Sequence, residues 1–167
     1  MKVTSPGIVD GVIDDAYGIK GETNAFGMPV VSLPLVIEEA PEGTKSFAIF
    51  LEDKDAFPVT GGFSWIHWVA ANIVDPVLEE DASRKHPNFV QGVNSWISSH
   101  GGNQDPAHCA CYGGMAPPDA PHIYELHVYA LDTLLPLRNG FYPNQLYRLM
   151  HGHVLEEVVV YGRYSPA

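Results

Sequence analysis

The chain has 167 residues, 46% of them hydrophobic, and a formal net charge of −11. This length suits one domain, so we expect residues 1–167 to form a single unit with its own core. The 9 Lys and Arg residues form no cluster, which argues against binding to nucleic acid or to anionic lipid surfaces. No apolar run approaches the ~20 residues of a membrane span.

In the first half of the chain, apolar runs predict strands. Residues 1–28 read as irregular with one short edge strand, and residues 30–37 as a strand that Pro34 confines to an edge or a bulge. The continuous apolar run at 46–51 predicts a strand buried on both faces, and residues 64–73 predict another. The 16 Gly and 14 Pro residues favour many turns, which is typical of a β-dominated fold.

The second half contains the best helix candidate. Residues 74–87 and 98–111 read as loops, and residues 117–121 as a rigid turn. The alternation over 122–131 predicts a strand with Tyr124, Leu126, Val128 and Ala130 on one face. Apolar residues at helical spacing predict a helix over 144–157 with Asn144 as its N-cap, and residues 158–164 read as a final strand.

Several acids and histidines border these apolar runs. Asp53 and Asp55 follow the strand at 46–51, His67 lies within an aromatic-rich run, and His122 follows the proline-rich turn. Taken singly, each has an ordinary structural role, such as a core histidine or a turn that caps a strand. Taken together, they predict a small pocket with polar groups at its floor, because buried polar groups need partners or a ligand.

A second candidate cluster lies in the loop at 98–111. His100, His108, Cys109 and Cys111 are all possible metal ligands, but their spacing matches no standard zinc pattern. A disulfide between Cys109 and Cys111 would be strained, so we expect reduced thiols. A zinc site there is a minor alternative.

Six segments in order resemble the phosphatidylethanolamine-binding protein family, in its bacterial and archaeal branch described as Raf-kinase-inhibitor-like. The resemblance runs from about residue 30 to 164. Its six matching segments are Asp53-Lys54-Asp55-Ala56, residues 65–73, residues 92–96, residues 112–118, the pair of runs 122–124 and 129–132, and residues 152–155. The chain departs from the family pattern where Lys54 and Phe57 replace prolines, at Met115-Ala116, and in the longer segment at 98–111.

The resemblance implies a sandwich of two antiparallel sheets with one or two short helices, the main one near the C-terminus. It also implies a pocket that holds phosphate, acetate or a phosphorylated head group. The implied polar wall is Asp53, His67, His122 and Tyr124, with Asp55, Trp65, Gly114, Pro117 and Pro118 shaping the pocket.

The residue chemistry suits an anion. Two imidazoles and a tyrosine hydroxyl can donate to its oxygens, free backbone N–H groups near Gly113 and Gly114 can add donors, and Asp53 can orient or protonate one histidine.

Three functions follow as hypotheses. The leading one is a cytoplasmic protein that binds a small anion or phosphorylated ligand, needs no cofactor or metal, pairs as a homodimer and modulates a partner such as a kinase or protease. The N-terminus lacks the apolar region of a signal peptide. The alternative is a hydrolytic or metal-dependent enzyme that uses Asp53, His67 and His122, although the sequence carries no Gly-x-Ser-x-Gly motif. The third is a structural sandwich with a vestigial pocket.

Overall fold

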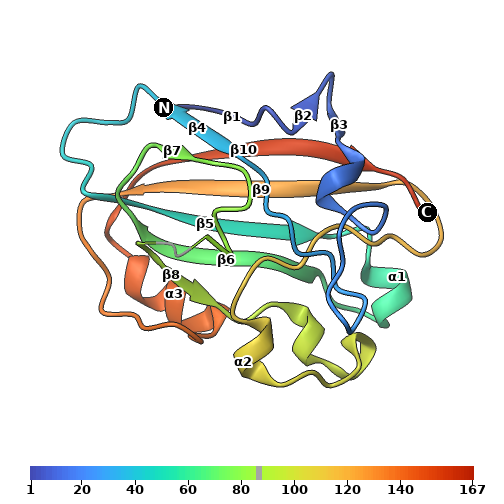
Figure 1. Cartoon of the computed structure of the whole chain (residues 1–167). Helices are drawn as coiled ribbons and strands as arrows, with labels where there is room; N and C mark the ends of the chain where they lie inside the picture. Colours follow the sequence, from blue (N-terminus) through green and yellow to red (C-terminus); the bar gives the residue numbers. More distant parts are fainter. Residues whose placement is uncertain (86–87) are drawn as a thin grey trace.

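A seven-stranded sheet runs through the middle of the computed structural model, which describes residues 1–85 and 88–167 (Figure 1). The sheet order is β2-β3-β10-β9-β5-β6-β8, and a second sheet has the order β1-β4-β7. With 36% of the chain in strands and 15% helical, the predicted β-dominated sandwich is confirmed. One difference is that β3 pairs with β10 in parallel, so the larger sheet is mixed.

The strands are β1 (Lys2–Thr4), β2 (Ile8–Val9), β3 (Val12–Ile13), β4 (Leu35–Glu38), β5 (Ser46–Asp53), β6 (Trp65–Ile73), β7 (Val77–Leu78), β8 (Val90–Gly92), β9 (His122–Leu131) and β10 (Val154–Tyr164). The α-helices are α1 (Phe57–Thr60), α2 (Pro106–Cys109) and α3 (Pro143–Met150), and short 3-10 turns are η1 (Asp15–Tyr17), η2 (Ser95–Ile97) and η3 (Ser99–Gly101). No helix in the described ranges is long and apolar enough to cross a membrane.

The central sheet is covered on both faces, which explains its apolar strands. One face, including Trp68 and Leu126, packs with the small sheet and the N-terminal loops. The other face, including Val69 and Tyr129, packs with Leu146 of α3. Every residue of β5 except Glu52 is buried, as expected for a strand between two packed layers. The strands predicted at 46–51, 64–73 and 122–131 are therefore confirmed.

The predicted helix at 144–157 is wrong in its second half. Helix α3 ends at Met150, a turn follows in which Gly152 has a φ of +81°, and β10 begins at Val154. The positive φ favours glycine and breaks the helix, and the valine-rich run after it suits a strand. The N-cap is Tyr142 rather than Asn144, and its backbone N–H donates to Gln145 Oε1 at 2.8 Å.

The other strand predictions need smaller corrections. Of the predicted strand at 30–37, only residues 35–37 pair with neighbouring strands, as part of β4 (Leu35–Glu38). This strand begins after Pro34, which has no N–H to donate. Residues 1–28 contain three short strands, and the predicted loop at 74–87 contains β7 within its described part; positions 86 and 87 lie outside the described residues.

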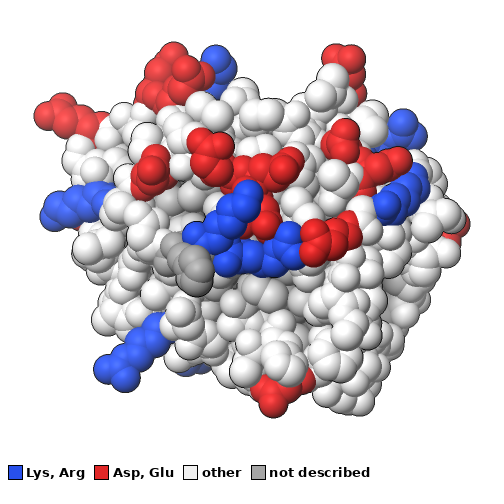
Figure 2. Space-filling view, viewed as in Figure 1, with Lys and Arg blue, Asp and Glu red and all other residues white. Residues whose placement is uncertain are grey.

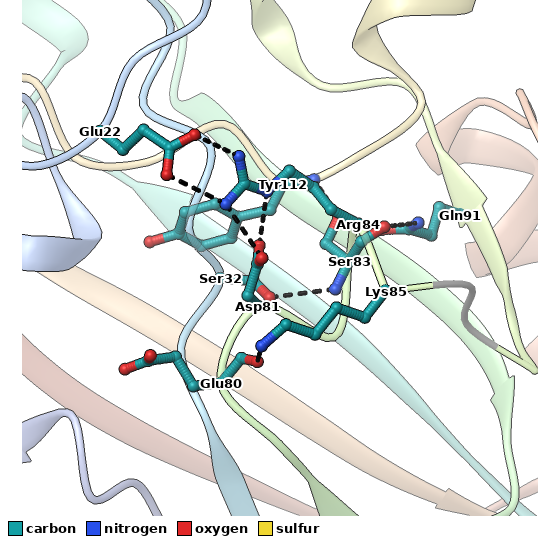
Figure 3. Close-up of polar contacts among 9 residues, drawn as sticks. All are labelled: Glu22, Ser32, Glu80, Asp81, Ser83, Arg84, Lys85, Gln91 and Tyr112. Carbon is teal, nitrogen blue, oxygen red and sulfur yellow. Dashed lines mark hydrogen bonds and ion pairs between the residues drawn. The ribbon is translucent and has the colours of Figure 1, made fainter.

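Arg84 links the long N-terminal loop to the segment before β8 through ion pairs (Figure 3). The Arg84 guanidinium contacts both carboxylate oxygens of Glu22, at 2.6 and 3.2 Å, and both oxygens of Asp81, at 2.6 and 2.9 Å. Beside it, Ser83 Oγ donates to Gln91 Oε1 and accepts from the Tyr112 N–H. Basic and acidic side chains thus lie side by side on this face (Figure 2), with no broad basic patch in the view.

Candidate functional site

A cavity of about 250 Å³ opens at the end of the central sheet that carries α1, on the right of Figure 1. Its walls come from the end of β5, from α1, from the start of β6 and from the loops before β9. The lining residues are Asp53, Ala56, Val59, Thr60, Trp65, His67, Trp96, His100, Ala116, Pro118 and His122.

A β-bulge places His67 in this cavity. Trp68 pairs with Leu51, and Ile66 pairs with Glu52, the next residue of β5. His67 is therefore an extra residue of β6 that has no partner on β5. Such a bulge re-aims side chains. Here Ile66 packs on the α3 side of the sheet, while Trp68 packs on the other side, and the His67 ring lies 5.1 Å from the Tyr124 ring.

His67 is buried with one nitrogen satisfied and one free. Its Nδ1 lies 2.7 Å from the Gly113 carbonyl oxygen and 3.0 Å from that of Gly114. Because carbonyls only accept hydrogen bonds, Nδ1 carries the proton. Nε2 is buried and has no hydrogen-bond partner within the described part of the chain. Burial lowers the pKa of His67, although the Asp53 charge opposes this, so the ring is neutral and Nε2 is an acceptor.

His122 lies between two carboxylates. Its Nδ1 is 2.7 Å from Asp53 Oδ2 and its Nε2 is 2.9 Å from Asp119 Oδ1. Burial opposes a charge on the imidazole, but the hydrogen bonds to Asp53 and Asp119 outweigh it and raise the pKa of His122. Both ring nitrogens are therefore donors in the charged form. The expectation that Asp53 orients a histidine agrees with this contact, whereas the expectation that His122 itself donates to a ligand does not.

Tyr124 adds a second unpartnered polar atom next to the cavity. Its side chain is 1% exposed, and its hydroxyl has no hydrogen-bond partner among the residues described. Burial, and then the charge of the nearby Asp53 carboxylate, raise the pKa of Tyr124, so the hydroxyl keeps its proton. It can donate to a ligand or to Asp53, with which it makes no well-aligned hydrogen bond.

The remaining predicted pocket residues divide into two groups. Trp65 and Pro118 line the cavity. Asp55 instead accepts from the Ile123 N–H at 2.8 Å, while Pro117 and Gly114 are buried but absent from the lining.

The predicted backbone donors are also wrong. The Gly113 N–H donates to the His67 carbonyl at 2.8 Å, and the Gly114 N–H donates to the Pro29 carbonyl at 2.9 Å. Neither N–H is free to donate to a ligand, because each already donates to a backbone carbonyl that is distant in the sequence. The local sequence does not reveal such pairing.

Sequence reasoning missed three polar groups of the site. Asp119 lies three residues before His122, and this short spacing could have suggested the contact between the two side chains. Trp96 was noted only as part of a matching segment, yet it lines the cavity and its buried Nε1 has no partner in the described residues. His100 was considered as a metal ligand, but it lines the cavity with its ring 5.5 Å from Phe63.

The alternative zinc cluster does not form. His108 stacks on Phe26 at 5.8 Å, and both cysteines are free. Burial raises the pKa of Cys109, and burial together with the Cys109 charge raises that of Cys111 to about 11. In the described part of the chain, the side chains close enough to share an ion are Glu52, Glu125 and His127.

The two cavity histidines should respond to pH with opposite sign. A histidine whose pKa is higher in the folded protein than in the unfolded chain stabilises the fold at pH values below its unfolded pKa of about 6.5. This stabilisation is lost as the pH rises through the pKa that the histidine has in the folded protein. The destabilisation caused by His122→Gln should therefore be largest near pH 5. The lowered pKa of His67 has the reverse effect, so His67→Gln should destabilise most above about pH 6.5. Urea unfolding between pH 5 and 8.5 checks this, and parallel pH profiles for the two variants would contradict it.

Comparisons with known proteins agree on one family. A sequence model described as phosphatidylethanolamine-binding protein matches residues 5–165. The uncharacterized protein YxkA of Bacillus subtilis is 45% identical over 137 residues, covering 80% of this chain and 81% of that protein. A protein from Methanothermobacter thermautotrophicus named only as UPF0098 is 33% identical and covers 92% and 91%.

Two solved structures have the same fold. One is a phosphatidylethanolamine-binding protein homologue from Chlamydia trachomatis, with a TM-score of 0.80, 30% identity and coverage of 99% of this chain and 97% of that chain. The other is YbcL of E. coli, described as a member of the mammalian family, with a TM-score of 0.77, 28% identity and coverage of 99% and 98%.

Proposed function

This chain belongs to the phosphatidylethanolamine-binding protein family, and we propose that its cavity binds a small ligand that carries a phosphate group. One observation supports this most directly. The buried Nε2 of His67, which lines a cavity with the size of a head group, has no partner within the described residues. The buried hydroxyl of Tyr124, whose ring lies against His67, has none either. Unpaired buried polar atoms cost free energy, which a bound ligand would recover.

The charges in the cavity favour a phosphate that also carries an amine. Asp53 and Asp119 bring two carboxylates, and the imidazolium of His122 offsets one of them. The Asp119 side chain is 50% exposed, so an ammonium group at that position would contact it from the solvent side. The phosphate would then receive hydrogen bonds from the Tyr124 hydroxyl and from His67.

Binding of a phosphate should take up a proton. Neutral His67 presents an acceptor at Nε2, which would repel an oxygen lone pair. A hydrogen bond therefore needs a proton on Nε2 or on the phosphate. Ligand binding near neutral pH should raise the number of bound protons, and affinity should increase as the pH falls.

Calorimetry with O-phosphoethanolamine and with inorganic phosphate tests the proposal. We expect millimolar to micromolar affinity, or about 4 to 8 kcal/mol. Two buffers with different ionisation enthalpies should give different apparent heats at one pH, because a proton is taken up. Tyr124→Phe removes one hydroxyl and should weaken binding by about 1 to 3 kcal/mol.

Tyr142→Phe is the matched control, because Tyr142 is 48% exposed and caps α3 rather than lining the cavity. Its affinity should equal that of the wild type. The proposal fails for both ligands if the wild type binds neither between pH 5 and 8, or if the two variants bind equally well.

The contacts of His122 and Thr60 argue against the enzyme alternative. His122 has both nitrogens occupied by carboxylates, so it has no free nitrogen for a metal. The Thr60 hydroxyl, which also lines the cavity, donates to the Phe63 carbonyl at 2.6 Å. The homodimer, the partner kinase or protease and the cytoplasmic location stay predictions. Phe57, Val59 and Phe63, exposed by 38 to 46% at and next to α1, offer an apolar surface beside the cavity for such a partner.

A further inference from the structure

Two glutamates face each other on the central sheet, outside the cavity. Glu52 of β5 pairs directly with Glu125 of β9, and their side chains are only 14% and 18% exposed. Like charges directly opposite on neighbouring strands destabilise a sheet. The Lys54 ammonium, which contacts both carboxylates, now offsets this repulsion, and a metal ion between them would do the same.

A histidine nitrogen points between these carboxylates. His127 lies two residues after Glu125 on β9, so both side chains are on the same face. Its Nε2 is 3.4 Å from Glu52 Oε1 and 3.4 Å from Glu125 Oε2. Nε2 is buried, and its contacts with the two carboxylates are ion-pair contacts rather than well-aligned hydrogen bonds. Ligands at the usual bond lengths around tetrahedral zinc are about 3.3 to 3.4 Å apart, so these separations already suit a shared ion.

A second layer of contacts holds the three side chains in place. His127 Nδ1 is 2.7 Å from Glu157 Oε1 of β10, which is the carboxylate–histidine arrangement that leaves Nε2 free for a metal. The Ser64 hydroxyl donates to Glu52 Oε2 at 2.6 Å and leaves Oε1 for the ion.

We propose that Glu52, Glu125 and His127 form a binding site for a divalent transition-metal ion such as Zn²⁺. Two carboxylates and one imidazole are a donor set that such ions accept, with a fourth position open to water. The Lys54 ammonium now contacts Glu125 Oε2 at 2.6 Å and Glu52 Oε1 at 3.5 Å. Its side chain is 50% exposed, so the ion can displace it into solvent.

This site is independent of the phosphate proposal. Side chains alternate along a strand. Asp53, the neighbour of Glu52, lines the cavity on the opposite face of the sheet and pairs there with Tyr124, the neighbour of Glu125. Glu52 and Glu125 instead lie on the face where Phe50 and Tyr147 pack. Either proposal can fail without the other.

Titration of the full chain with Zn²⁺ against a competing chromophoric chelator tests the site. The wild type should bind one equivalent tightly. His127→Gln should weaken binding about tenfold or more, as loss of a ligand does. Lys54→Met removes the competing ammonium and should tighten binding several-fold, which a disrupted fold could not produce.

His153→Gln is the matched control, because His153 also contacts a carboxylate at 2.7 Å, that of Asp132, but is not in the site. Its zinc affinity should equal that of the wild type. Co²⁺ spectra of the wild type should lack a thiolate charge-transfer band. No zinc binding by either the wild type or Lys54→Met, equal affinity for His127→Gln, or a thiolate band would overturn the proposal.

Discussion

Replacing Trp68 with alanine is expected to lower the free energy of unfolding by about 3 to 5 kcal/mol. The side chain has no exposed surface and packs edge-on against Tyr112 and Phe89, with ring centroids 5.6 and 6.3 Å away. Its Nε1 donates to Gln91 Oε1 at 2.8 Å, where Ser83 also donates. Truncation would therefore leave a large cavity and weaken the polar network beside it.

Urea unfolding at pH 7 measures the effect, and the same strand offers a matched control. Trp65 is three positions away but only half-buried, since it lines the cavity. Trp65→Ala should lower the free energy of unfolding clearly less than Trp68→Ala, because water can fill the space that the side chain leaves in the open cavity. Trp68→Phe keeps most of the packing and should cost about 1 to 2 kcal/mol through the lost hydrogen bond and volume. A smaller loss for Trp68→Ala than for Trp65→Ala would contradict the placement of Trp68 in the core.

Asp53→Ala is expected to destabilise the protein by about 3 kcal/mol, because it breaks a buried ion pair and leaves the His122 imidazolium with one partner. Asp53 is 3% exposed. Its carboxylate contacts His122 Nδ1 at 2.7 Å and accepts from the Ala56 N–H at 3.2 Å. The variant should also lower the pKa of His122, which a histidine NMR titration would show directly.

Asp55→Ala is the control for this variant. Asp55 lies two residues after Asp53, which ends β5, but Asp55 is exposed and accepts one backbone hydrogen bond, from Ile123. Its loss should cost about 1 kcal/mol or less and leave the titration of His122 unchanged. Equal destabilisation by the two substitutions would show that the Asp53–His122 contact adds nothing to the stability of the loop.

The local pattern of apolar residues was sufficient to predict the strands that are buried in the core. The apolar run in β5 and the alternation in β9 both follow from burial, which side-chain type determines one residue at a time. The end of α3 was not predictable in this way. Val154 continues the helical spacing of Leu146 and Met150, but pairing of β10 with β9 along Val154–Tyr164 takes this segment into the sheet. Pairing over many residues outweighs a local helical preference.

By itself, the sequence determined the fold class and most members of the candidate site, because apolar periodicity and the ordered segments around Asp53, His67 and His122 are local features. The tertiary structure decided what each member contacts. A bulge in β6 turns His67 toward Tyr124, distant carbonyls occupy the Gly113 and Gly114 N–H groups, and Asp119 completes the pair of carboxylates around His122. These contacts depend on strand register and on segments that approach from elsewhere in the chain, which residue type and spacing do not specify.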